Sequence, residues 1–191
     1  VRSRGLGDVY KRQESEGTPT MEKIASYVRQ GAMSYLKQQY KVVGLVFLGL
    51  VILFSIMAYG FNLQNPWVPI AFLTGGFFSG LSGFLGMKTA TYDSARTANA
   101  AQHSLNKGLR VAFRSGAVMG LVVVGLGLLD ISFWYILLDY CIPTDALIPS
   151  AKLCVITTTM LTFGMGASTQ ALFARVGGGI YTLSLIHISE P

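Results

Sequence analysis

Charged residues are scarce in this sequence. Only 13% of its 191 residues are Asp, Glu, Lys or Arg, whereas 51% are hydrophobic. A soluble domain usually carries about 25% charged residues, so the composition argues against an ordinary soluble domain. The 22 glycines point the same way, because glycine is more frequent in membrane helices than in soluble ones.

Cysteine and histidine are also few, and their spacing indicates no metal site. Cys141 and Cys154 have neither CxxC nor Cys/His spacing, which argues against a zinc site and a disulfide framework. His103 has no neighbours spaced like metal ligands, and the second histidine, His187, lies in the C-terminal tail. The glycines at 177–179 do not fit GxxxxGK[ST] and follow no predicted strand, so a phosphate-binding loop is not supported.

The two ends of the chain resemble the two strands of one DNA sequence. Codons for LSLIHISEP (183–191) exist whose complementary strand encodes GLGDVYKRQ (5–13). We therefore interpret residues 1–13 and 183–191 as translated sequencing adapter, which is expected to have no part in the fold. The natural segment, residues 14–182, is then expected to be an internal fragment. Without the ends, 11 of 15 basic and 7 of 9 acidic residues remain, so the net charge falls from +6 to +4 and no basic arm for nucleic acid is left.

Four apolar segments are each long enough to cross a bilayer, for which about 20 mostly apolar residues are needed. They are residues 42–60, 67–87, 116–138 and 147–173. The fourth is the weakest, because Lys152 and several threonines dilute it. The sequence thus predicts an all-α, polytopic transmembrane helix bundle with about four membrane helices.

Basic residues alternate with these predicted spans. The segments before residue 42, between 87 and 116, and after 173 carry Lys or Arg, whereas 61–66 carry no charge and 139–146 carry only acidic charge. The positive-inside rule places the basic segments in the cytoplasm. Four spans that agree with one orientation predict an integral, multi-pass membrane protein.

The predicted helices extend beyond the membrane. The connection 88–115 has no proline and many alanines, which are the best helix formers, and its turn is predicted at 106–108. Another helix is predicted to begin after Thr18, with Pro19 in its first position and Glu22 in its first turn.

Small residues recur within three of the spans and predict close helix packing. The stripes are Gly75, Ser79 and Gly83; Gly116 and Gly120, with Gly125; and Ala167, Ala171 and Gly179 around Arg175. Such stripes occur in membrane proteins of every function, so they predict packing and no activity.

Asp130 lies within the third predicted span. An aspartate at the centre of a membrane helix costs about 2.5–3.5 kcal/mol on insertion scales, which invites a functional interpretation. Asp130 is past the middle of its span, however, toward the outer side. We prefer an aspartate that faces the interface or is paired locally over one that lies on an ion path.

Arg175 follows the fourth apolar segment. It shares a helix face with Ala167 and Ala171 and lies two helical turns after Ser168. If this face packs against other helices, the guanidinium needs a carboxylate partner, and the segment offers no obvious one. From spacing alone two interpretations stay open, a functional buried arginine or a positive-inside anchor at a helix end.

Several long stretches resemble the membrane-integral, ion-translocating inorganic pyrophosphatases. They are SGFLGMKTATYDSARTANAA (82–101), GLRVAFRSGAVMG (108–120), FGMGASTQALFARVGGGIYT (163–182) and, upstream, VRQGAMSYLKQQYK (28–41). The resemblance implies a pyrophosphate-energised pump for H⁺ or Na⁺, a homodimer with 16 membrane helices per subunit. It implies that this segment holds the second helix through the first part of the fifth, in what we expect to be a prokaryotic plasma membrane.

The resemblance also assigns roles to residues. Arg175 matches the family's gate arginine below the hydrolytic site, and Ser168 matches a small polar position that faces the same funnel. The aspartates that bind pyrophosphate and Mg²⁺ are expected to follow residue 182, and Asp93, Asp130 and Asp145 do not match them. The chain alone is therefore expected neither to hydrolyse pyrophosphate nor to pump.

Other properties stay open at this point. The choice between H⁺ and Na⁺ and any dependence on K⁺ rest on later helices of the family. The alternative interpretation is a secondary transporter or channel subunit without hydrolytic activity, because its glycine-rich helices would look much the same.

Overall fold

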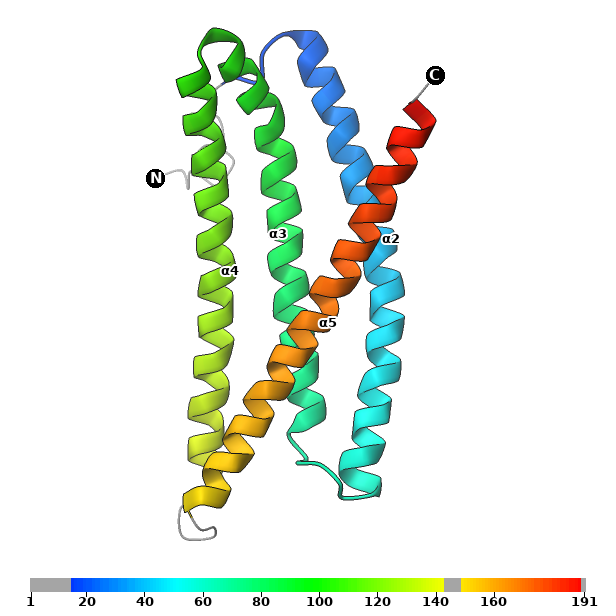
Figure 1. Cartoon of the computed structure of the whole chain (residues 1–191), viewed down its shortest axis with the longest axis vertical. Coiled ribbons are helices and arrows are strands. Elements are labelled where there is room, and N and C mark those ends of the chain that lie inside the picture. Colours follow the sequence, from blue (N-terminus) through cyan, green and yellow to red (C-terminus); the bar gives the residue numbers. More distant parts are fainter. Residues whose placement is uncertain (1–14, 143–148, 190–191) are drawn as a thin grey trace, which may run out of the picture. The chain divides into compact units, whose positions relative to one another are not determined.

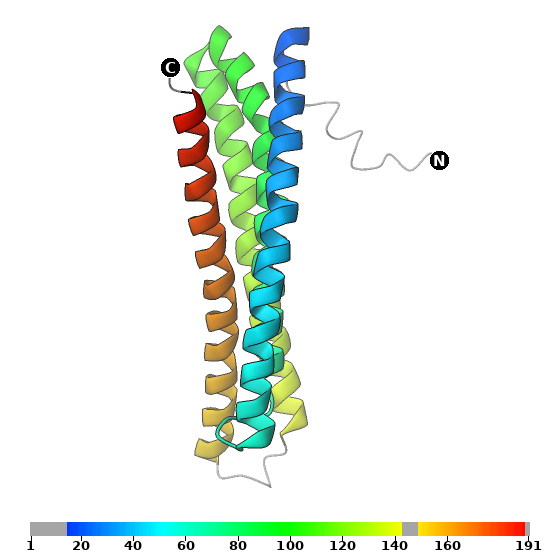
Figure 2. The ribbon, with the colours of Figure 1, turned by 90° about the vertical axis from the view of Figure 1, so that its right-hand side faces the viewer.

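The computed structural model describes residues 15–142 and 149–189, and every regular element in these ranges is helical. The elements are α2 (Pro19–Ser55), which continues as the π-helix η1 (Ile56–Gly60), α3 (Val68–His103), α4 (Leu105–Cys141) and α5 (Pro149–Ser189). In both views α5 is one long unbroken ribbon, and Figure 2 shows the same for α2 (Figures 1 and 2). The predicted all-α class is confirmed.

The start of α2 follows the predicted capping pattern. The backbone N–H of Met21 donates to the Thr18 hydroxyl at 3.4 Å, and the N–H of Glu22 donates to the Thr18 carbonyl at 3.0 Å. Pro19 occupies the first helical position, where its missing N–H leaves no bond unmade.

The turn between α3 and α4 differs from the prediction. The helices are separated by Ser104 alone, so residues 106–108 belong to the first turn of α4. Serine is a favoured residue at a helix start, and the Ser104 carbonyl accepts the N–H of Gly108 at 3.0 Å. A Cβ on Gly108 would lie 2.8 Å from the Ala101 Cβ. The glycine therefore permits close packing of α3 and α4 and does not make the turn.

Three of the described helical segments are long and apolar enough to cross a membrane: Pro19–Gly60, Val68–His103 and Leu105–Cys141. They contain the first three predicted spans except Trp67, which directly precedes α3, and the chain is an integral membrane protein segment. Residues 149–173 of the fourth predicted span lie in α5, which is not among the three, and residues 147 and 148 lie outside the described residues. A fourth crossing stays a prediction.

The described chain forms two compact units; α2, α3 and α4 contribute to both, and α5 belongs to unit 2 alone. Unit 1 comprises residues 15–34 and 86–120, and unit 2 comprises residues 35–85 and 121–189. In unit 1, α3 and α4 approach closely at Gly86, where a Cβ would overlap the side chain of Met119.

Unit 2 has two small apolar cores. One contains Ala71, Trp134, Leu138 and Ile156 from α3, α4 and α5, and the other contains Val43, Phe47 and Phe72 from α2 and α3. At the ends of α4 and α5, the Lys152 ammonium lies 2.8 Å from a carboxylate oxygen of Asp139. Lys152 is therefore paired at a helix end, in keeping with its predicted position near the end of a span.

Candidate functional site

One face of α5 packs against α3 in unit 2. A Cβ on Gly75 of α3 would overlap the carbonyl of Phe163, and a Cβ on Gly166 would overlap the carbonyl of Phe72. The Ser79 hydroxyl donates to the carbonyl of Ala167 at 3.1 Å. Glycine and serine thus let the two backbones touch, which confirms the packing predicted for the Gly75 and Ser79 stripe.

The same face of α5 also meets α2. The side-chain amide of Gln39 donates to the carbonyl of Phe173 at 3.3 Å. A Cβ on Gly177 would lie 2.7 Å from the Tyr35 hydroxyl oxygen. Burial raises the pKa of the Tyr35 hydroxyl above its ordinary value.

Arg175 and Ser168 lie on the opposite face of α5. An α-helix turns by 360° in about 3.6 residues, so Arg175, nine residues after the packed Gly166, is about half a turn away from it. Ser168 is seven residues before Arg175 and falls on nearly the same line. Both side chains are exposed. Among the described residues, no carboxylate lies within 4.0 Å of the Arg175 guanidinium.

The packing predicted for the Ala167 and Ala171 stripe occurs only at Ala167, whose carbonyl meets Ser79 of α3. Ala171 and Gly179 are exposed beside Arg175, and a Cβ on Gly179 would meet no atom within 4 Å. Three glycines of α4 also face open space in the described structure: a Cβ on Gly116, Gly120 or Gly125 would meet no atom within 4 Å. The sequence pattern found the small residues but not which of them pack here.

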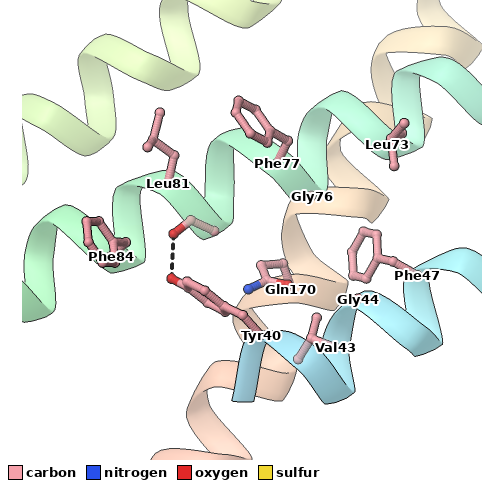
Figure 3. A pocket seen from close by; sticks show the side chains of 11 residues that line it. Tyr40, Val43, Gly44, Phe47, Leu73, Gly76, Phe77, Leu81, Phe84 and Gln170 are labelled. Carbon is pink, nitrogen blue, oxygen red and sulfur yellow. Dashed lines mark hydrogen bonds between the residues drawn. The ribbon is translucent and has the colours of Figure 1, made fainter. Parts of the chain in front are cut away.

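A cavity of about 390 Å³ lies between α2, α3 and α5 (Figure 3). Its lining is mostly aliphatic and aromatic, and its polar side chains are Tyr40 and Gln170. The Tyr40 hydroxyl donates to the carbonyl of Gly80 at 2.6 Å, and burial raises the pKa of Tyr40. Such a lining suits an apolar occupant and carries no acid–base pair.

A cluster of ion pairs occupies unit 1, and sequence reasoning did not find it. One carboxylate oxygen of Glu16 lies 2.6 Å from the Arg29 guanidinium and 3.4 Å from that of Arg96. Arg96 also lies 3.4 Å from the Asp93 carboxylate, and Arg29 stacks over the Tyr92 ring with 4.2 Å to its centroid. The spacing of three between Asp93 and Arg96 is a recognisable helical pair.

A turn before α2 brings Glu16 to this cluster. Gly17 has a φ of +100°, a conformation that L side chains rarely adopt. The side-chain amide of Asn99 donates to the Ser15 carbonyl at 3.0 Å. These contacts hold the segment before α2 against α3 within unit 1.

Nearly the whole chain matches one known protein family. A family model described as inorganic H⁺ pyrophosphatase matches residues 7–184. The chain belongs to the H⁺ pyrophosphatase family. The resemblance seen in the sequence is thereby confirmed. The match includes residues 7–13, and their attribution to adapter stays a prediction.

Curated members of the H⁺ pyrophosphatase family align with 89% of this chain. A Bacteroides thetaiotaomicron protein, provisionally named K(+)-stimulated pyrophosphate-energized sodium pump, is 86% identical over 170 residues. A Moorella thermoacetica protein named K(+)-insensitive pyrophosphate-energized proton pump 2 is 39% identical over 171 residues. The chain spans 23% of the length of each of these relatives.

The described residues do not fit the magnesium that the H⁺ pyrophosphatase family implies. They contain no group of three or more His, Cys, Asp or Glu that could hold a metal ion. The carboxylates of Glu16 and Asp93 are engaged by guanidinium groups, and Asp145 lies outside the described residues. We therefore derive no step of a reaction through a metal in this part of the chain.

The interpretation of Asp130 as facing the interface or paired locally was wrong. Asp130 is fully buried, with 0% of its surface exposed. Neither of its carboxylate oxygens has a hydrogen-bond partner among the described residues. Sequence position alone suggested the outer interface, whereas helix packing encloses the side chain.

Proposed function

We propose that a full-length protein built on this chain couples hydrolysis of inorganic pyrophosphate to outward ion transport across a membrane. The observation that carries this proposal is the family match over residues 7–184. The apolar helices supply the membrane setting that such a pump needs. The family match favours this activity over the secondary transporter or channel considered from the sequence.

For the transported ion we propose Na⁺, with stimulation by K⁺. The 86% identical relative carries a sodium-pump name that includes K⁺ stimulation, whereas the relatives named as proton pumps are 34–39% identical. A relative from Clostridium tetani with a sodium-pump name is only 40% identical, so the support comes from the 86% relative alone.

Arg175 is the residue of this chain that we propose at the ion gate, with Ser168 lining the same path. Both lie on the α5 face that the described helices leave open, where carboxylate and lysine partners from further helices have room to approach. A buried guanidinium with such partners would attract or repel a passing cation according to how they are paired. Mg²⁺ and pyrophosphate would then bind elsewhere, and two copies would form the pump.

Purified full-length protein in lipid vesicles tests the proposal. We expect Mg²⁺-dependent phosphate release, uptake of radioactive sodium that requires pyrophosphate, and a higher rate with K⁺. Arg175→Ala should abolish sodium uptake, while Arg110→Ala, which removes an exposed cation, should preserve it. Phosphate release from the 191-residue chain alone would contradict the expected absence of a hydrolytic site from this chain.

A further inference from the structure

Asp130 lies on the most enclosed face of α4. Trp134 and Leu138 follow it by one and two helical turns, so the three residues share that face. All three are buried, with exposed fractions of 0%, 2% and 0% respectively. Trp134 and Leu138 belong to the core formed with Ala71 and Ile156 from α3 and α5. The carboxyl group is therefore part of the interior of unit 2.

The donor groups of the polar contact one helical turn after Asp130 are already used. The Trp134 indole N–H donates to the Thr74 hydroxyl at 2.9 Å, and that hydroxyl donates to the Ala71 carbonyl at 3.0 Å. Both Asp130 oxygens are enclosed without a donor from the described residues. The side chain is already covered by these helices, so another segment would reach it only if they separated.

No opposite charge faces Asp130 from the neighbouring helices. Residues 42–60 of α2 and η1, 67–87 before and in α3, and 153–174 of α5 contain no Asp, Glu, Lys, Arg or His. The titratable side chains in these segments are Tyr59 and Cys154, and α4 adds Tyr135. All three are exposed. Within residues 115–138 of α4, Asp130 is the only Asp, Glu, Lys, Arg or His.

An ionised carboxylate is costly in such a place. Burial of a charge without a partner costs several kcal/mol or more, whereas a neutral carboxyl group avoids most of that penalty. A bound metal cation would need several oxygen ligands, and the described residues contain no cluster of acidic groups to supply them. A proton, in contrast, needs only one oxygen atom, which the Asp130 carboxyl group itself supplies.

We propose that Asp130 is a proton-binding site inside the membrane part of the protein. The carboxyl group holds a proton at neutral pH, and its O–H bond stays intact while α3, α4 and α5 are packed. When the helices separate enough to admit water, the O–H bond breaks, the proton passes to water and the carboxylate remains. This site is independent of the hydrolytic reaction and of which ion is pumped.

Infrared spectroscopy of the full-length protein in lipid bilayers tests the proposal. At neutral pH we expect the carbonyl absorption of protonated carboxyl groups to fall by one group per chain in Asp130→Asn. The matched control Asp139→Asn should keep the band, because Asp139 is paired with Lys152. Isotope labelling of aspartate carboxyl carbons in the unmodified protein should shift the same band, which keeps the test valid if the variant folds poorly.

Two results would overturn the proposal. A spectrum unchanged by Asp130→Asn, in a variant whose helical content is preserved, would show that Asp130 is ionised. Loss of the band on addition of Na⁺ at constant pH would show a cation site in place of a proton site. Neither readout depends on pyrophosphate, so a failure here is distinguishable from a failure of the proposed pump activity.

Discussion

Units 1 and 2 each bury a residue type that normally carries a charge, and they treat it differently. Arg96 in unit 1 is 7% exposed, and its guanidinium lies between the carboxylates of Glu16 and Asp93. Asp130 in unit 2 is 0% exposed and has no partner among the described residues. In unit 1, opposite charges neutralise the buried guanidinium. In unit 2, the described residues offer no opposite charge, and binding of a proton is the simplest way to neutralise Asp130.

The difference follows from what each unit has available. Unit 1 is built from segments that contain Arg29, Glu16 and Asp93 close to Arg96. The apolar segments of unit 2 around Asp130 contain no basic residue at all. Membrane helices are held together by small residues and close backbone contact in place of charge pairs, as Gly75 and Gly166 illustrate.

Removal of Arg96 should have the largest effect on stability. Breaking a buried ion pair on one side leaves uncompensated charge, and Arg96→Ala should lower the free energy of unfolding by about 3 kcal/mol. Asp130→Asn, which replaces the carboxyl O–H with an amide NH2 of similar size, should change it by less than about 1 kcal/mol. Denaturant unfolding in detergent measures both, and an equal loss for the two variants would show that Asp130 is ionised and paired.

Glycine packing should give the next largest effect. Gly75→Ala places a methyl group against the Phe163 carbonyl and should cost about 2 kcal/mol, the usual penalty of overpacking. Gly125→Ala meets no atom within 4 Å in the described structure and should stabilise the helix by about 0.5–1 kcal/mol. Thermal unfolding compares the two, and a loss for Gly125→Ala would show that another helix covers that face of α4.

The hydrogen bond between Trp134 and Thr74 should contribute less. A neutral hydrogen bond is worth about 1 kcal/mol net, so Trp134→Phe and Thr74→Val should each destabilise unit 2. A double-mutant cycle isolates the pair, and we expect a coupling energy of about 1 kcal/mol. A coupling energy near zero would mean that the indole and hydroxyl contribute by packing alone.

High pH should produce the smallest effect. Burial raises the pKa of Tyr40 above its ordinary value of 10.0, so the folded state holds this proton more tightly than the unfolded state. The resulting stability is fully present below pH 10 and is lost as the pH rises through the folded-state pKa. Tyr40→Phe should flatten this part of the pH profile, measured by unfolding at a series of pH values, and an unchanged profile would contradict the assignment.

Local sequence patterns predicted the helices well, but they did not predict contacts between residues that are far apart in the sequence. The apolar runs and the Thr18–Pro19 start are properties of neighbouring residues, and both appear in the structure. Glu16 meets Arg96 across 80 residues of sequence, a contact that depends on how α2 and α3 pack. Gly108 looked like a turn residue because its real use, close approach to Ala101, has no local signature.

The candidate site was predicted only in part for the same reason. The motif around Arg175 identified the family, and the family match confirmed it. Spacing alone did not show which face of α5 would be covered by α2 and α3. Asp130 was misplaced because its depth in a span was read as distance from the interface, whereas its burial depends on the side chains of three helices.

The close approach of Gly75 to Phe163 and of Gly166 to Phe72 sets the spacing of α3 and α5 by backbone atoms alone. A methyl group at either glycine would therefore push the two helices apart at that point. Arg175 lies nine residues beyond Gly166, about 13 Å along the axis at 1.5 Å per residue. A tilt of α5 by about 5° caused by such a methyl group would displace the backbone at Arg175 by roughly 1 Å.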